Sequence, residues 1–256
     1  AVGTLLRDWR QRRRMSQLDL AGEAAVSARH LSFVETGRSK PSRELILHLA
    51  QHLDVPLRER NALLLAGGYA PVYAEHKLDD EAMAPVREAL DRVLASHEPY
   101  PAIVVDRRWN IVSTNQTALT LMGANVAPEL LVPPINGLRI SLHPEGLARF
   151  ITNLGEYSAH VLHRLHQQAV LSQDPEVAAL YDELRGYPGV EETSPAVFEP
   201  AALIFTTLRL RLDGQDLAFF STLATFGTAL DVTLAELSIE SFFPADPETE
   251  AALRPT

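Results

Sequence analysis

The chain of 256 residues contains no cysteine. Disulfide bonds and thiolate metal sites are therefore excluded, and this absence is typical of a protein kept in the cytoplasm. No apolar run approaches the roughly 20 residues that a membrane-spanning helix needs. The first residues, AVGTLLRDWR, also lack the basic-then-apolar layout of a secretory signal. We therefore expect a cytoplasmic protein with no membrane among its partners.

The motifs of common catalytic and metal sites are also missing. The sequence has no G-x-S-x-G element and no phosphate-binding glycine loop. His48 and His52 are four residues apart, but HLAQH lacks the glutamate that a zinc protease motif requires. His160, His163 and His166 recur at every third residue with no carboxylate in the run. We expect no catalytic residue, no metal ligand, no required cofactor and hence no enzyme.

Basic residues are scarcer than acidic ones, 23 against 33, which gives a net charge of −10. The first 70 residues differ from this average, because they hold eleven basic and seven acidic side chains and so carry +4. The remainder then carries −14. A basic end on an acidic chain is the asymmetry that points to a nucleic-acid-binding part.

Local signals divide the chain into three parts. Residues 1–71 are predicted to form five short helices joined by tight turns, an all-α domain. Residues 72–98 are predicted to be a linker followed by an amphipathic connecting helix from Met83 to Ser96. Residues 99–256 mix strands and helices, which predicts an α+β domain with an antiparallel sheet of about five strands covered by helices.

The third part has recognisable hairpins. AIVVDRRWNIVSTN contains two apolar runs around a turn that begins with Asp106, and Asp213-Gly214 separates two further alternating runs. A last strand is expected over residues 234–243, although its pattern would also allow a helix. A long helix is expected over residues 144–173, and another over residues 174–188.

Two capping signals organise the second and third helices of the first part. Ser16 can cap the second helix, with Asp19 completing an acidic capping box, and Ser27 can cap the third, which ends at Gly37. In the third helix, ARHLSFVE, Leu31 and Val34 share a face that would meet the core. The opposite face carries four residues that no core requires: Ala28, Arg29, Ser32 and Phe33.

That face has the chemistry of base recognition. An arginine can pair bidentately with guanine, a small side chain admits close approach, and a phenyl ring can touch a thymine methyl group. Residues suited to grip the phosphate backbone flank the helix: Gln17, Ser27, Arg38, Lys40 and Arg43. Periodicity alone leaves the alternative open that this is a compact helical domain with surface arginines and a phenyl ring that meets a neighbouring domain.

The stretch SQLDLAGEAAVSARHLSFVETGRSKPS resembles the XRE, or Cro/CI-type, helix-turn-helix family. The matching positions are Ser16-Gln17, Leu20-Ala21, Ala25-Val26-Ser27, Leu31, Val34-Glu35, Gly37 and Pro41-Ser42. The resemblance implies that the third helix enters the major groove of double-stranded DNA. It also implies binding as a homodimer to two-fold-related half-sites.

Four further segments resemble the MmyB-like transcriptional regulators, a subgroup of that family. They are RHLSFVETGRS, VPLRERNALLLAGGYAP, LRISLHPEGLARFITN and FGTALDVTLAELSIESFFPAD, and the resemblance covers nearly the whole chain. It implies a C-terminal ligand-binding domain related to PAS domains. The small apolar ligand that it implies is a long-chain fatty acid or a similar molecule.

The long helix offers a candidate ligand site. Four polar residues lie on one helical stripe, and Val161 belongs to the adjacent apolar stripe with Leu154 and Leu165. The predicted ligand-binding residues are Asn153, Tyr157, His160, Val161 and Arg164. Arg164 can hold a carboxylate in a charge-assisted pair, beside donors from the phenol and the amide. The alternative is that the stripe is solvated or satisfies buried backbone groups.

Three functions compete at this point. The first is a ligand-responsive transcription regulator, the second a DNA-binding module fused to an enzyme-like domain, and the third a DNA-binding module fused to a domain that only dimerises. A cavity without a reactive dyad favours the first. A cluster of acid, base and nucleophile in one cleft favours the second, and a solid core favours the third.

Overall fold

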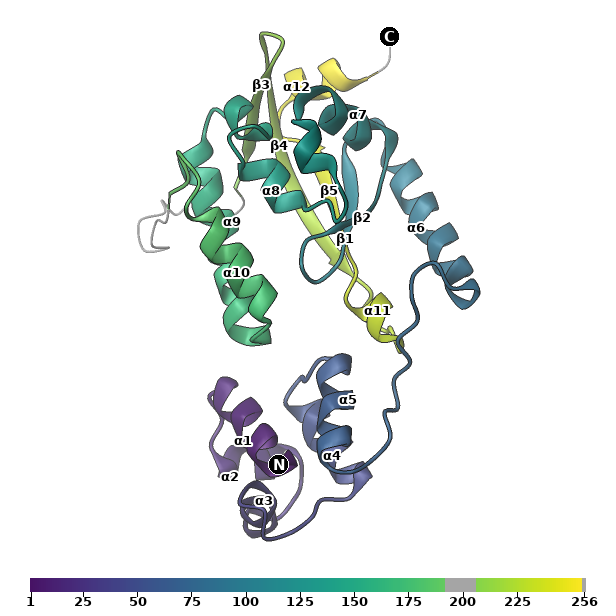
Figure 1. Ribbon diagram of the computed structural model, residues 1–256, viewed down its shortest axis with the longest axis vertical. Helices are drawn as coiled ribbons and strands as arrows, with labels where there is room; N and C mark the ends of the chain where they lie inside the picture. The colour runs from purple at the N-terminus through teal and green to yellow at the C-terminus, as the bar shows by residue number, and fades with distance from the viewer. Residues whose placement is uncertain (192–205, 255–256) are drawn as a thin grey trace. The chain divides into compact units, whose positions relative to one another are not determined.

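The computed structural model describes residues 1–191 and 206–254 (Figure 1). Its internal contacts divide the chain into two compact units. The N-terminal unit is Ala1–Ala82 with Gly227–Ala235, and the C-terminal unit is Met83–Phe226 with Glu236–Thr256. The chain therefore passes from one unit to the other three times. Of the helices in the described part of the chain, none is both long and apolar enough to span a membrane.

Five helices form most of the N-terminal unit, as predicted. They are α1 (Val2–Arg12), α2 (Gln17–Glu23), α3 (Ala28–Glu35), α4 (Arg43–His52) and α5 (Leu57–Ala66). Their apolar faces meet in one core, where Leu6, Leu20, Leu31, Ile46 and Leu49 are almost completely buried. Burying such side chains supplies the main stabilising free energy, about 1.5–3 kcal/mol for each one.

Side-chain caps set the start of three of these helices. The predicted capping box is present: the Asp19 amide donates to Ser16 Oγ at 3.1 Å, and the Ser16 amide donates to Asp19 Oδ2 at 2.8 Å. Ser27 Oγ accepts from the His30 amide at 3.4 Å, so it caps α3. Gly37, with φ of 73°, follows the end of that helix. These bonds satisfy amides that a helix start leaves unpaired.

One segment of the N-terminal unit comes from far along the chain. We call residues 227–235 the β4–β5 insert, because they connect two strands of the C-terminal unit. The insert contains the short helix α11 (Val232–Ala235), which contacts α5. Val232 is completely buried. The sequence predicts that this segment belongs to the third part, residues 99–256, because no local signal links it to the first 82 residues.

The C-terminal unit is built on a five-stranded antiparallel sheet, as predicted, in the order β2-β1-β5-β4-β3. The strands are β1 (Ala102–Val105), β2 (Ile111–Thr114), β3 (Leu208–Leu212), β4 (Gln215–Thr225) and β5 (Ser238–Pro244). Asp213 and Gly214, both with positive φ, form the predicted hairpin turn between β3 and β4. The first of the two runs around this turn is PAALIFTTLRLRL, residues 200–212, for which the sequence predicts a strand; its part over residues 200–205 lies outside the described residues.

Helices surround this sheet (Figure 1). They are α6 (Ala84–Ser96), α7 (Gln116–Asn125), α8 (Gly137–Leu142), α9 (Leu154–Ser172), α10 (Pro175–Leu184) and α12 (Pro247–Leu253), with 3₁₀ turns at Glu81–Met83, Pro128–Leu131 and Leu147–Phe150. Buried residues of β1, α8, α9 and α10 share one core, which includes Leu142, Leu162, Leu165 and Leu184. The amphipathic α6 buries Leu90 and Leu94 and contacts β1.

Two predicted elements differ from the structure. The helix expected from residue 144 begins only at Leu154, because Ile151 bridges to Leu210 of β3 and Asn153 bonds to the start of that strand. A side chain at Gly146 would lie 2.3 Å from the Ile140 carbonyl oxygen. The last strand begins at Ser238 rather than at residue 234, since residues 232–235 form α11.

Candidate functional site

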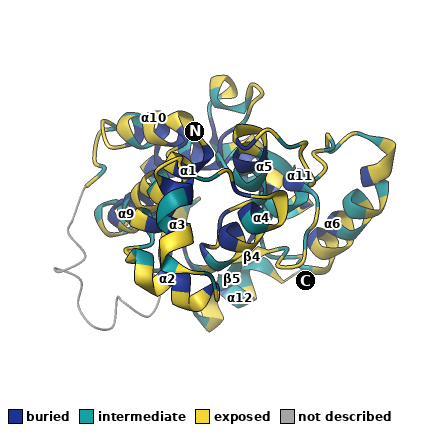
Figure 2. Cartoon of the chain, turned by 90° about the horizontal axis from the view of Figure 1, so that it is seen from below, coloured by how far each residue is buried: buried dark blue, intermediate teal, exposed yellow. Residues whose placement is uncertain are grey.

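Helix α3 presents two chemically different sides. Leu31 and Val34 are each 1% exposed and pack into the core, whereas Arg29 is exposed and Ser32 and Phe33 are half-buried. Figure 2 shows buried and exposed parts next to each other on α3. The Arg29 guanidinium lies over the Phe33 ring, 5.4 Å from its centroid. Ala28 is also half-buried and packs against the core. The helix therefore holds an arginine and a phenyl ring together at the surface.

A buried ion pair holds α3 against α1. Arg10 donates to both carboxylate oxygens of Glu35, at 2.7 and 2.9 Å, and Gln17 Nε2 donates to the same carboxylate at 2.7 Å. Burial by itself raises the pKa of Glu35, but the bonds from Arg10 and Gln17 outweigh burial and hold the pKa below its ordinary value. The three side chains thus join α1, α2 and α3. Sequence reasoning did not find the pairing of Arg10 with Glu35, because the two residues lie 25 residues apart.

The residues predicted to contact phosphates lie around α3. Arg38, Lys40 and Arg43 are exposed, and the Lys40 ammonium lies 5.4 Å from the centroid of the Tyr69 ring. Ser27 is exposed at the start of α3, where it serves as the cap. Gln17 already uses one amide N–H on Glu35. Its predicted phosphate contact stays a prediction.

An apolar hollow lies in the C-terminal unit between the sheet and α7. It consists of two adjoining pockets of about 350 Å³ and about 60 Å³ that share four wall residues: Pro101, Leu121, Leu210 and Phe219. Leu253 of α12 lines the larger pocket, and Gly137, Ile140 and Ser141 of α8 line the smaller one. A concave site with mostly apolar walls is what a small apolar ligand requires. This hollow, referred to below as the α7 hollow, was not located by the sequence.

The predicted α9 stripe lies elsewhere. None of its five residues is in the wall of the α7 hollow. Asn153 connects α9 to β3, donating to the Thr207 carbonyl at 2.7 Å and accepting from the Arg209 amide at 3.1 Å. Val161 is 2% exposed and belongs to the core. His160 is at the surface, and its pKa is lowered first by partial burial of the ring and then by Arg164 and His163.

Arg164 and Tyr157 belong to a polar cluster between α9 and strand β5. The Arg164 guanidinium lies 3.6 Å from Glu240 Oε1 of β5 and 4.5 Å from the centroid of the Trp109 ring. Glu240 is 6% exposed and also accepts from Ser221 at 3.1 Å. Burial, with a further contribution from Glu240, raises the pKa of Tyr157 to about 12, so the phenol stays protonated. A carboxylate from the protein itself therefore already faces Arg164.

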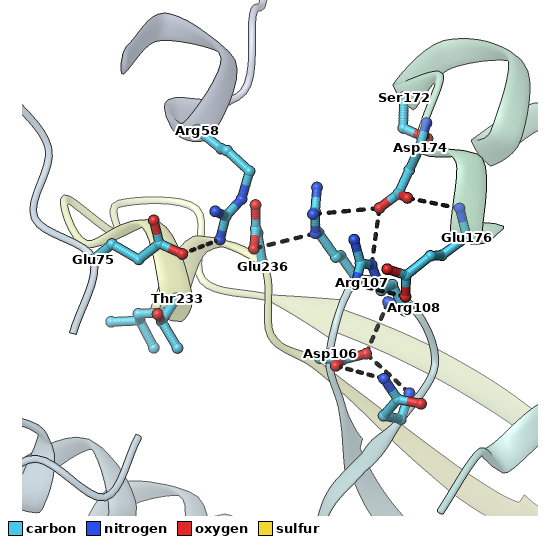
Figure 3. Close-up of polar contacts among 12 residues, drawn as sticks. Arg58, Glu75, Asp106, Arg107, Arg108, Ser172, Asp174, Glu176, Thr233 and Glu236 are labelled. Atoms are coloured by element: carbon cyan, nitrogen blue, oxygen red, sulfur yellow. Dashed lines mark hydrogen bonds and ion pairs between the residues drawn. The ribbon is translucent and has the colours of Figure 1, made fainter. Parts of the chain in front are cut away.

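A second charged cluster joins the β1–β2 turn to α10 (Figure 3). Arg107 and Arg108 both reach Asp174 Oδ2, at 3.3 and 3.0 Å. Asp174 also caps α10, and although burial by itself raises its pKa, these bonds hold the pKa below the ordinary value. Arg107 lies 3.6 Å from Glu236, which directly follows the β4–β5 insert. The cluster therefore holds Glu236, the first residue after the insert, within the C-terminal unit.

The insert itself is held by residues 74–76. Asp231 Oδ2 is 2.7 Å from His76 Nδ1 and accepts from the His76 amide at 3.2 Å. The Val232 amide donates to the Ala74 carbonyl at 2.8 Å, and Thr233 Oγ1 donates to the His76 carbonyl at 2.6 Å. These four contacts join two segments about 155 residues apart in the chain.

Residues 72–75 are in turn fixed to α5. Asn61 Oδ1 accepts from the amides of Val72 and Tyr73, at 3.0 and 3.1 Å. The Arg58 guanidinium lies 2.5 Å from the Glu75 carboxylate (Figure 3). The insert, residues 72–76 and α5 therefore form one connected structure inside the N-terminal unit.

Within the described residues, no three histidine, aspartate or glutamate side chains are grouped so that they could hold a metal ion.

Two family models match the chain. Residues 1–63 match a helix-turn-helix domain, and residues 86–255 match the MmyB-like transcription regulator ligand binding domain. A comparison with curated proteins found no match.

Proposed function

Because the chain belongs to the MmyB-like transcription regulators, we propose that its C-terminal unit senses an elongated, fatty-acid-like molecule and thereby changes how its N-terminal unit binds an operator. The helix-turn-helix match and the ligand-binding match make the chain a ligand-responsive, DNA-binding transcription regulator. Both matched families are regulatory binding domains rather than enzymes. We take the C-terminal unit to work in the manner of a PAS sensor.

One observation carries the DNA-binding part of this function. Helix α3 buries Leu31 and Val34 and leaves Arg29 beside Phe33 at the surface. We propose that this side reads base edges in the major groove, together with Ala28 and Ser32. Gln17, Ser27, Arg38, Lys40 and Arg43 then hold the phosphate backbone and fix the orientation of α3.

Replacing Arg29 by alanine tests this assignment. We expect Arg29→Ala to cost about 1–3 kcal/mol of binding free energy on the cognate operator and to relax discrimination at one base pair. Lys40→Ala should instead weaken binding to all sequences alike and lower the salt slope by about one. Fluorescence anisotropy with a set of operator variants separates the two effects. An unchanged ranking of operators in Arg29→Ala would mean that α3 does not read the bases.

The ligand part of the function is supported by the α7 hollow. Its walls are mostly leucine, isoleucine and phenylalanine side chains, and the larger pocket is of a size that holds a small ligand. We propose that an alkyl or acyl chain lies along this hollow against β3 and β4. Denaturing mass spectrometry of the purified protein should release a lipid-sized molecule. Two results together would contradict the proposal. Protein from several growth conditions would release no such molecule, and added ligands of every acyl-chain length would leave its melting temperature unchanged.

Two chain connections can carry the response to the DNA-binding helices. The first is the connecting helix α6, which begins where the chain first enters the C-terminal unit. The second is the β4–β5 insert, which continues directly from β4 and into β5. Ligand bound against the sheet can alter DNA affinity only if it binds two arrangements of these connections unequally. We propose that the insert and α6 together transmit that difference.

A further inference from the structure

The two pockets of the α7 hollow differ in their exposure to solvent. The wall of the smaller pocket includes core side chains that are at most 8% exposed: Ala118, Met122, Ile140 and Leu147. The exposed residues in the wall of the larger pocket all belong to α7: Gln116, Thr120 and Ala124. The hollow therefore has an apolar inner end in the core and a rim along α7 that is open to water.

This difference orients an amphiphilic ligand. Burial of an alkyl chain against apolar walls is favourable in proportion to the area removed from water. A charged head group loses free energy if it leaves water without a partner, so it stays at the solvent-open rim. We therefore place the methyl end of the chain in the smaller pocket and the head group at the rim.

The two ends of the rim carry opposite charges. At the start of α7, Glu98 Oε1 accepts from the amides of Gln116 and Thr117, at 2.7 and 3.2 Å. At the end of α7, Arg149 Nη2 donates to the carbonyl of Asn125, which lines the larger pocket, at 3.0 Å. An anionic head group is therefore repelled at the first end and attracted at the second.

Arg149 is held beside the hollow and has donors to spare. It belongs to the 3₁₀ turn Leu147–Phe150, whose first residue lines the smaller pocket. Its guanidinium lies 4.9 Å from the centroid of the Phe150 ring, which supports it from one side. The side chain is exposed, and within the described residues no carboxylate forms an ion pair with it. A guanidinium has five N–H donors, so several remain for a ligand.

Two other arginines are alternatives, and both already have a carboxylate partner. Arg254 follows the wall residue Leu253 but pairs with Glu250. Arg164, which the sequence predicts as the partner of the head group, lies 3.6 Å from Glu240. A ligand would have to displace the protein's own carboxylate from either of them, whereas Arg149 requires no such exchange.

We infer that Arg149 binds the carboxylate of the ligand at the end of α7, while the alkyl chain fills the α7 hollow. The assignment rests on the proposed function, because it concerns the same ligand site. It makes Arg149 the residue that distinguishes a fatty acid from an uncharged molecule with the same chain. The head group stays partly hydrated at the rim, so the contribution of Arg149 is moderate and sensitive to salt.

The test uses full-length protein freed of lipid and two probes with the same chain, dodecanoic acid and dodecan-1-ol. Dissociation constants are measured by calorimetry at pH 7.5, where the acid is ionised. We expect Arg149→Gln to weaken binding of the acid by about three- to tenfold and to leave the alcohol unchanged. Added salt should weaken binding of the acid to the wild-type protein more than to the variant.

Three further variants locate the effect. Arg149→Lys keeps the positive charge and should retain most of the affinity for the acid. Arg92→Gln removes the same charge from an exposed position of α6, so it is the matched control and should change neither probe. Arg164→Gln tests the alternative at α9 and should not weaken the acid more than the alcohol.

The outcomes separate this inference from the proposed function. Loss of affinity for the acid alone in Arg149→Gln, with recovery in Arg149→Lys, supports both. If Arg149→Gln binds both probes as the wild type does, or weakens both equally, Arg149 does not hold the head group and the apolar sensor still stands. A selective loss of the acid in Arg164→Gln also overturns the inference. If neither probe binds or raises the melting temperature, the proposed ligand class is wrong and the inference falls with it.

Discussion

Glu35 ends α3 and has a side chain that is only 1% exposed. Its carboxylate accepts three hydrogen bonds, two from Arg10 and one from Gln17. Because these bonds lower the pKa of Glu35 in the folded state, the folded protein binds its proton more weakly than the unfolded chain does. The stability that the pair contributes is therefore complete above the ordinary glutamate pKa of 4.5 and is lost as the pH falls below it.

Glu35→Gln should lower the free energy of unfolding at pH 7 by about 3–5 kcal/mol, because it leaves the Arg10 guanidinium buried without its counter-ion. Urea denaturation between pH 3 and pH 7 measures this change. The wild-type protein should lose more stability than the variant over that range, since the variant has no carboxylate to protonate at this position. Parallel pH curves for the two proteins would show that the pair is not the acid-sensitive element.

The β4–β5 insert depends on Asp231, which pairs with His76 and also accepts from its amide. Asp231→Asn weakens both contacts but keeps the side-chain shape. We expect the His76 and Val232 amides to exchange with solvent on the order of tenfold faster, because a hydrogen bond to a charged group contributes about 1.5–3 kcal/mol. Hydrogen exchange followed by mass spectrometry or NMR measures this directly.

The same substitution should also reduce the effect of ligand on DNA affinity. Coupling between two sites commonly amounts to about 1–3 kcal/mol, and loss of the insert should remove part of it without altering ligand affinity itself. Asp79→Asn is the matched control, because it removes the same charge from an exposed position of the N-terminal unit. If Asp231→Asn makes the His76 amide exchange faster but keeps the full ligand response, as the control does, the insert is structural and α6 carries the coupling.

The complete regulator should bind its operator as a dimer. One short recognition helix reaches few base pairs, so two copies on half-sites about 34–36 Å apart supply the specificity that one lacks. We expect sedimentation to show a dimer on operator DNA and binding that is cooperative in protein concentration. A single copy per operator, both at low and at high protein concentration, would contradict this expectation.

The sequence alone determined the elements that depend on neighbours in the chain. Ser16 and Ser27 cap helices through amides three residues away, and Leu31 and Val34 share a helix face through the helical repeat. The Asp213-Gly214 pair likewise predicted the turn of the hairpin between β3 and β4 from adjacent residues alone. Such signals need only a few residues of context, so the five helices, the α+β class and the outward side of α3 were all accessible.

Only the tertiary structure decided what depends on distant partners. It paired Arg164 with Glu240, formed an apolar hollow at α7 whose wall does not include the α9 stripe, and moved residues 227–235 into the N-terminal unit. Helical periodicity shows that a helix has a polar stripe but not which surface that stripe meets. The partner is chosen by the packing of strands and helices whose contacts span tens to more than a hundred residues, and no local pattern in the chain encodes that choice.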